Sequence, residues 1–224
     1  MAQLVLAGLE RAYDVFALAL DAGDDAAVTA AIDLVAARGR LDILHSHAGI
    51  QVPGRLTDIG PEGMDASWRL NVRAHFIAAR AAMPQMQRQR KGSIIITASN
   101  SGVQYDRGMI AYCTTKHAVI AMTRQIAVDY ARFGVRCNAL CPGFVDTPLT
   151  RQNTFPMPFL ITAEKAAQEI IVGLEKGEFE IHFPKAFTRT LRTLRILPYS
   201  LYFAAVRKIT ANKNKTELGH EQNK

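Results

Sequence analysis

A tyrosine and a lysine four residues apart offer the clearest chemistry in this sequence. Tyr112 and Lys116 open a stretch whose apolar spacing predicts a helix, so both side chains are expected on one helix face. An ammonium close to a phenol favours the phenolate, and we therefore expect Lys116 to lower the pKa of Tyr112. A tyrosine with a lowered pKa can exchange protons near neutral pH.

A serine precedes this pair at a position that also favours ligand binding. Ser99 directly follows the apolar run at 93–98, which predicts a buried strand of a parallel sheet. Open α/β sheets bind their ligands at the carboxyl ends of the strands. We therefore expect the Ser99 hydroxyl to share a site with Tyr112 and Lys116.

Strands and helices alternate along the chain. Apolar runs predict strands, and 3.6-residue spacing predicts helices with an N-cap at Asp24 or Asp25 for the second of them. The expected strands lie at 15–20, 41–45, 93–98, 134–141 and 179–183, and the expected helices at 4–13, after Asp25, 64–89, from 111 onward and 163–176. This alternation predicts an α/β fold with a doubly wound, Rossmann-like parallel sheet.

Composition narrows the class of protein. The chain has 224 residues, of which 49% are hydrophobic, so one substantial core is expected. No apolar run is long enough to cross a membrane, and the first residues lack the features of a signal peptide. Three cysteines in a chain of this length indicate a reducing compartment, which predicts a cytoplasmic protein.

The positive charge is concentrated at the end of the chain. The last forty residues carry nine Lys or Arg against two Asp or Glu, which accounts for the whole net charge of +7. We therefore divide the chain into a domain at 1–184 and a basic amphipathic extension with a polar tail at 185–224. The extension could cover a substrate cleft, pack on a neighbouring subunit, or contact an anionic membrane weakly through 185–210. No nucleic acid partner is expected.

Histidines and cysteines have plainer interpretations. His45 and His47 alternate on one strand face, but no Cys or carboxylate lies at a matching ligand spacing, so no metal site is expected. Cys137 and Cys141 share a strand face and are expected to pack in the core. Cys113 is expected to be a buried thiol on another face of the helix than Tyr112.

Ser99 followed by Tyr112-x-x-x-Lys116 resembles the active site of the short-chain dehydrogenase/reductase family, and the resemblance extends over about residues 5–184. It implies an enzyme that interconverts an alcohol and a carbonyl with NAD or NADP. Tyr112 would exchange the proton, while Lys116 would lower its pKa and hold the nicotinamide ribose. Ser99 would polarise the substrate oxygen, and Asn71 would hold a water that relays protons through Lys116.

The same resemblance implies where the cofactor lies. Asp21 falls where the family has an aspartate that contacts adenine, and Ala48-Gly49 matches the end of an Asn-Asn-Ala-Gly turn, in which Ser46 and His47 replace the asparagines. Together with Tyr112 and Lys116, the nicotinamide end would be held by a Pro-Gly-x-x-x-Thr stretch, whose residues here include Pro142, Gly143, Val145 and Thr147. The choice between NAD and NADP stays open.

One departure from the family is large. The family opens with a strand, a glycine-rich phosphate-binding turn, a helix and a second strand, whereas Gly8 is the only glycine before Asp21. We therefore expect an N-terminally incomplete fold with its first two strands missing and with weakened cofactor binding. The run at 15–20 would then pair with the strand at 41–45 or leave that strand as an edge.

Two functions from different classes follow. The first is the NAD(P)-dependent oxidoreductase described above. The alternative is a catalytically impaired, cofactor-free relative that acts as an oligomer subunit or interaction protein. In similar reductases, the helices corresponding to 64–89 and 111–133 pair between subunits, so a homodimer or homotetramer is expected. Small residues would allow these helices to approach closely, at Ala78, Ala79, Ala81, Ala82, Ala118 and Ala121.

Overall fold

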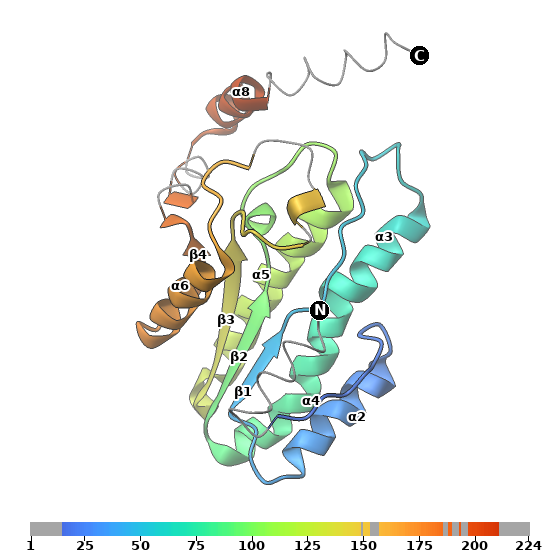
Figure 1. The fold of residues 1–224 in the computed structure, drawn as a ribbon, viewed down its shortest axis with the longest axis vertical. Coiled ribbons are helices and arrows are strands. Elements are labelled where there is room, and N and C mark those ends of the chain that lie inside the picture. The colour runs from blue at the N-terminus through green and yellow to red at the C-terminus, as the bar shows by residue number, and fades with distance from the viewer. Residues whose placement is uncertain are drawn as a thin grey trace.

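A parallel sheet forms the centre of the computed structural model, which describes residues 15–148, 150–152, 157–185, 188–189, 193 and 197–210. Each neighbouring pair of strands is parallel, and Ser46 lies opposite Ile96 while Thr97 lies opposite Leu140. The carboxyl ends of the strands therefore meet at one edge of the sheet (Figure 1). In spatial order the strands are β1 (Ile43–Ser46), β2 (Gly92–Thr97), β3 (Val135–Pro142) and β4 (Glu180–Phe183).

Helices connect these strands in the order predicted. Asp24 caps the first described helix, because its Oδ1 accepts hydrogen bonds from the backbone N–H groups of Ala26 and Ala27. The predicted α/β fold with a parallel sheet is confirmed. α2 (Asp25–Ala36) precedes β1, and α3 (Pro61–Trp68), a π-helical turn (Arg69–Arg73) and α4 (Ala74–Gln89) connect β1 to β2. A 3-10 turn (Asn100–Gly102), α5 (Ile110–Tyr130) and a second 3-10 turn (Ala131–Phe133) connect β2 to β3. A third 3-10 turn (Thr150–Gln152) and α6 (Ala163–Glu175) connect β3 to β4, and α8 (Tyr199–Thr210) follows β4.

The predicted strand at 15–20 is wrong. This stretch forms no strand, and the side chains from Phe16 to Leu20 are exposed. An apolar run becomes a strand only where a neighbour completes its hydrogen bonds, and in the described residues β1 pairs only with β2. β1 is thus an edge strand among the described residues, and its Ile43 is 63% exposed. Of the two outcomes expected, pairing with the run at 15–20 or an exposed edge, the structure has the exposed edge.

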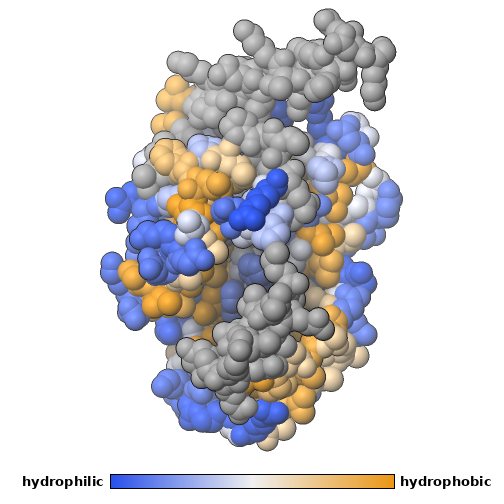
Figure 2. Space-filling view, in the orientation of Figure 1, coloured by the Kyte–Doolittle hydropathy of each residue, from blue (hydrophilic) through white to orange (hydrophobic). Residues whose placement is uncertain are grey.

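Across the face shown in Figure 2, hydrophobic and hydrophilic side chains are interspersed.

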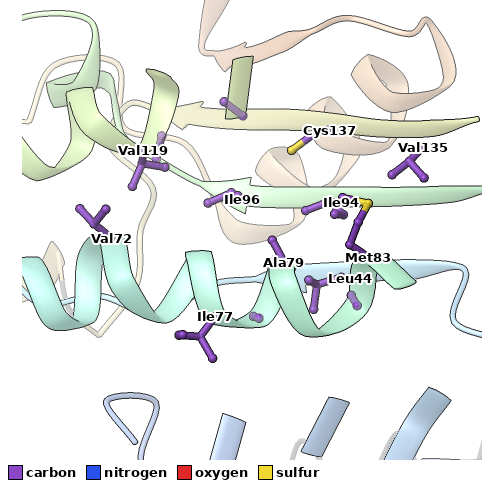
Figure 3. Packing of buried hydrophobic residues seen from close by; sticks show 14 of the residues in the cluster. Leu44, Val72, Ile77, Ala79, Met83, Ile94, Ile96, Val119, Val135 and Cys137 are labelled. Carbon is purple, nitrogen blue, oxygen red and sulfur yellow. The ribbon is translucent and has the colours of Figure 1, made fainter. Parts of the chain in front are cut away.

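The two faces of the sheet carry separate hydrophobic clusters. Ile94 and Ile96 point to the face covered by α2, α4 and α5, whereas Ile95 points to the face covered by α6. On the first face α4 lies along the strands and directs Ala79 and Met83 against them (Figure 3). Because both faces of β2 are covered, its carboxyl end is held in place from two sides.

The C-terminal extension is only partly described. α8 begins at Tyr199, directly after Pro198. The helix expected at 4–13 and much of 185–224 lie outside the described residues, so the division into 1–184 and 185–224 stays a prediction. Among the described helices, none combines the length and the hydropathy needed to cross a bilayer.

Candidate active site

The first turns of α5 bring the predicted tyrosine and lysine to the carboxyl end of β2. Lys116 Nζ lies 5.7 Å from the centre of the Tyr112 ring and donates a hydrogen bond to the Thr97 carbonyl at 2.9 Å. The Ser99 side chain is hydrogen bonded to Tyr112. Its Oγ also accepts from the Ser101 N–H at 3.1 Å, which caps the 3-10 turn after β2. The structure thus brings Ser99, Tyr112 and Lys116 together.

The pKa of Tyr112 differs from the sequence expectation. Burial raises it above the usual value of 10.0, and this effect outweighs the hydrogen bond from Ser99, which lowers it. The expectation that Lys116 lowers the pKa of Tyr112 is therefore wrong for this structure. The physical reason is desolvation, which penalises the phenolate and also lowers the pKa of Lys116 to about 8.

Asn71 lies in the π-helical turn and is fully buried. Its Oδ1 accepts from the Ile50 N–H at 2.7 Å, and its Nδ2 donates to the Ile50 carbonyl at 3.0 Å and to Thr115 Oγ1 at 3.0 Å. One amide therefore joins the helix, the loop after β1 and the first turns of α5. π-Helical turns are frequent at functional sites.

A second buried side chain holds the same loop, and the sequence analysis missed it. His75 lies four residues after Asn71 and has no exposed surface, and its Nδ1 lies 2.6 Å from Ser46 Oγ. Asn71 and His75 thus fix the two ends of the segment from Ser46 to Ile50. The signal available in the sequence was this four-residue spacing, which places both polar groups on the buried face of one helix.

The segment between these two anchors passes directly over Lys116. A Cβ placed on Gly49 would lie 3.1 Å from Asn71 Oδ1 and 3.5 Å from Lys116 Nζ. The absence of a side chain at Gly49 therefore leaves space beside the lysine ammonium, next to Ala48. This arrangement suits a ligand hydroxyl that accepts a hydrogen bond from Lys116.

Two histidines lie at the carboxyl end of β1, where this segment begins. His45 Nε2 lies 3.1 Å and His47 Nδ1 lies 2.9 Å from the same atom, Thr97 Oγ1. Both rings are exposed on one side, and their partial desolvation lowers both pKa values. The charge of Lys116 lowers the pKa of His47 further, and the charge of His47 does the same for His45. No trio of His, Cys, Asp or Glu in the described part of the chain could hold a metal ion.

The remaining predicted cofactor residues lie at two other places. Pro142 ends β3, and the Gly143 N–H donates to the Phe183 carbonyl at 2.7 Å. Val145 forms a bridge with Ile161, and the Thr147 N–H donates to Thr150 Oγ1 at 2.9 Å. These residues share the carboxyl edge of the sheet with Ser99.

Asp21 lies outside this group. Its Oδ1 accepts from the Gly23 N–H at 2.8 Å in the turn before α2, and its Oδ2 lies 4.0 Å from Arg69 Nη1.

The cysteines are buried, as predicted. Burial raises the pKa of Cys113 to about 11 and that of Cys137 to about 12. Both are therefore thiols at neutral pH, which argues against a nucleophilic role.

Known proteins share this sequence pattern. The sequence model described as short chain dehydrogenase matches residues 2–156. Oxidoreductase UcpA of Escherichia coli is 35% identical over 178 residues, which cover 75% of this chain and 68% of that protein. The 2-(R)-hydroxypropyl-CoM dehydrogenase of Xanthobacter autotrophicus is 39% identical over 135 residues, 58% of this chain. The matched part spans 54% of that relative, about half its length.

Solved structures share the fold. A gluconate 5-dehydrogenase from Burkholderia cenocepacia, in complex with NADP and tartrate, has a TM-score of 0.63 and 31% identity over 68% of this chain and 62% of its own. ElxO with NADP bound has a TM-score of 0.65 and 27% identity over 73% of this chain and 75% of its own. With the parallel sheet and the family match on 2–156, these findings show that the chain belongs to the short-chain dehydrogenase family, a family of oxidoreductases.

Proposed function

We propose that this chain is an NAD(P)-dependent oxidoreductase that interconverts an alcohol and a carbonyl at Ser99, Tyr112, Lys116 and Asn71. The observation that carries the proposal is the geometry of the first three residues. Ser99 is hydrogen bonded to Tyr112, and the buried Lys116 lies 5.7 Å from the same ring. NAD(P) use is supported by the family match and by the NADP-bound structures of similar proteins.

Proton transfer is assigned to Tyr112. Because burial raises its pKa, Tyr112 is a phenol at neutral pH and donates its proton to the carbonyl oxygen during reduction. The nicotinamide cofactor, when bound, supplies the hydride in that direction and accepts it in the other. Ser99 donates a hydrogen bond to the same oxygen. Lys116 is charged below its pKa of about 8 and is assigned to hold the ribose at the nicotinamide end of the cofactor.

The carboxyl edge of the sheet offers partners for the nicotinamide end of the cofactor. Lys116 and the open space at Gly49 would receive the ribose, with Ala48 and Asn71 lining that space. Pro142, Gly143, Val145 and Thr147 follow the end of β3 at the same edge, and Asp21 is the proposed adenine contact.

Cofactor affinity is expected to be low in the chain as printed. Its sequence before Asp21 has no glycine-rich turn for the cofactor phosphates. Each charge-assisted hydrogen bond lost would cost about 1.5–3 kcal/mol, so we expect millimolar binding of NAD(H) and NADP(H). Calorimetric titration of both dinucleotides measures this, and micromolar affinity would contradict it.

Turnover tests the reaction itself. We expect absorbance changes of the reduced nicotinamide when the chain is mixed with millimolar NAD(H) or NADP(H) and a panel of small alcohols and ketones. A folded chain that binds cofactor yet transfers no hydride to any member of the panel would count against the proposal. A folded chain that binds neither dinucleotide would favour the cofactor-free alternative.

Assembly into a homodimer or homotetramer is proposed as well, with one change from the sequence expectation. Ala78, Ala79 and Ala82 are buried in the core of their own chain and are not available to pack between subunits. Ala81, Ala118 and Ala121 are not fully buried and stay in the proposal, together with exposed apolar side chains on the two helices, Phe76 at 51% and Val128 at 77% exposed. Light scattering at micromolar concentration distinguishes an oligomer from a monomer.

The basic extension is proposed to touch anionic membranes weakly through 185–210. Each basic residue near such a surface contributes about 1 kcal/mol, and salt screens the attraction. Co-sedimentation with anionic vesicles at low salt should weaken when 185–224 is deleted. A cytoplasmic location is proposed on the cysteine content alone.

A further inference from the structure

The histidine pair at the end of β1, His45 and His47, takes no part in the proton chemistry described above. We propose that this pair binds the diphosphate of the dinucleotide cofactor and takes up one proton from solvent as it does so. The inference rests on the proposed function for the identity of the ligand. The contacts that support it, those of His45 and His47 with Thr97 and with each other, do not depend on that function.

Positive groups crowd around the pair. The positive charge of Lys116, on α5, lowers the pKa of His47, and that of His47 lowers the pKa of His45. The charges of all three lower the pKa of the buried His75 on α4. Among the described residues, no carboxylate contributes to the pKa shift of His45 or of His47. In the described residues, the electrostatic partners of His45 and His47 are therefore basic groups alone, and a bound anion would relieve their mutual repulsion.

The shared hydroxyl of Thr97 limits how the two rings can be protonated. A hydroxyl has one proton, so it can donate to only one of the two ring nitrogens that approach it at 2.9 and 3.1 Å. If it donates to one neutral ring, that ring has its own N–H directed away from Thr97. The other neutral ring must then donate to Thr97, and its second nitrogen has no proton.

One added proton changes this arrangement. The second ring then also has an outward N–H, and the pair presents two donors and one positive charge. The ring centres are 5.5 Å apart, so the two donors can reach different oxygens of one anionic group. Protonation thus converts the pair into a site that matches a diphosphate, and binding of the anion and of the proton must strengthen each other.

The place in the fold favours the cofactor as the source of the anion. The pair lies at the carboxyl end of β1, directly before Ala48 and Gly49, and one side of it is turned toward Lys116. His47 occupies the position where the short-chain dehydrogenase family has an asparagine, whose side chain cannot gain a proton. The exposure of both rings leaves them accessible to a ligand.

Calorimetry with ADP-ribose tests the proposal without any turnover. The diphosphate of ADP-ribose is esterified at both ends and does not titrate near neutral pH. Any proton taken up on binding is therefore taken up by the protein. We expect titrations in two buffers of different ionisation enthalpy to show uptake of up to one proton. Affinity should rise at least tenfold from pH 8 to pH 6.5, because each proton taken up changes affinity by up to tenfold per pH unit.

Variants assign the effect to the pair. We expect the double variant His45→Asn with His47→Asn to bind ADP-ribose at least tenfold more weakly at pH 6.5 and to lose the pH dependence. His117→Gln, on α5, is the matched control and should keep both. In the unmodified chain, the ring resonances of His45 and His47 should move on addition of ADP-ribose, which guards against a folding defect in the variants.

The outcomes separate this proposal from the proposed reaction. Absence of binding, absence of proton uptake, or a double variant that binds like the unmodified chain would each overturn the diphosphate site. If inorganic pyrophosphate binds as tightly as ADP-ribose, the assignment to a dinucleotide is wrong. Proton-linked binding without hydride transfer would leave this site in place and remove the proposed reaction instead.

Discussion

The carboxyl ends of β1 and β2 are neighbours in the sheet, yet they hold their polar groups in different ways. At β2, Lys116 is buried and hydrogen bonded to the Thr97 carbonyl, and Tyr112 is hydrogen bonded to Ser99. At β1, an edge strand among the described residues, His45 and His47 are exposed at the start of a loop that is anchored from α4. The protein itself thus fixes the groups to which we assign proton transfer, whereas the groups that we propose to bind an anion remain exposed to solvent.

Acid should release the β1 end first, and this is the largest effect we expect. Burial and nearby positive groups lower the pKa of His75 from 6.5 to about 3. Between pH 6.5 and pH 3, this side chain is therefore protonated in the unfolded chain but neutral in the folded chain. Stability therefore falls as pH falls from 6.5 to 3, by up to about 5 kcal/mol at 1.36 kcal/mol per unit. Urea unfolding at several pH values measures the loss.

The variant His75→Gln should flatten that acid-dependent loss, whatever its stability at neutral pH. His117→Gln serves as the control for removal of a histidine elsewhere. An unchanged slope in His75→Gln would show that the β1 loop is not the acid-sensitive part of the fold.

Alkali should act on the β2 end. Burial lowers the pKa of Lys116 from 10.5 to about 8, so the folded chain releases a proton that the unfolded chain keeps until higher pH. Below pH 8, burial of this charge lowers the free energy of unfolding by about 3 kcal/mol. This loss disappears as pH rises from 8 to 10.5. The stability difference between the unmodified chain and Lys116→Met isolates this effect from the titration of tyrosines and cysteines. A difference that is independent of pH would contradict the buried position of Lys116.

Removing the tyrosine hydroxyl tests the proton chemistry directly. Tyr112→Phe should lower turnover by about 10²-fold or more, or about 2.7 kcal/mol in the barrier, because no other group replaces the general acid. Tyr199→Phe, in which the changed residue is 80% exposed, is the matched control. Comparable turnover in Tyr112→Phe and the unmodified chain would remove Tyr112 from the reaction.

The smallest effect should come from the residue that joins the two strand ends. Thr97→Val removes the hydroxyl shared by His45 and His47 but keeps the carbonyl that accepts from Lys116. We expect a loss of about 1 kcal/mol in unfolding free energy, since both hydrogen bonds are exposed to solvent. Ring resonances of both histidines should shift in this variant, and the absence of any shift would disprove the shared contact.

Sequence reasoning predicted well where local pattern and packing agree. The strands at 93–98 and 134–141 and the helix after Met109 were found because apolar runs there coincide with a two-sided core. The run at 15–20 has the same apolar character, but among the described residues no strand lies beside it, and a pattern of residues cannot show whether a partner exists. The proximity of Ser99, Tyr112 and Lys116 followed from spacing and from the strand end.

Burial explains what was missed at the site. The spacing of Tyr112 and Lys116 indicated that their charges interact, but the direction of the pKa shift depends on how much water reaches the phenol. The link from His75 to Ser46 crosses 29 residues of sequence, so it became visible only after α4 had been placed against β1. Such long-range hydrogen bonds set the balance between desolvation and attraction in a buried site.

The π-helical turn at Arg69–Arg73 restricts how the length of this helix can vary. Ala74 donates its N–H to the Arg69 carbonyl, five residues back, so the turn contains one more residue than a regular helix would need. A π-turn accommodates one extra residue without rotating the helices on either side of it, so deleting one residue there would leave α3 and α4 in place and would move the side chains within the turn. Asn71 and His75 could then no longer reach Ile50 and Ser46 together, so we expect single-residue deletions to be tolerated in the preceding loop at 51–60 and rejected in this turn.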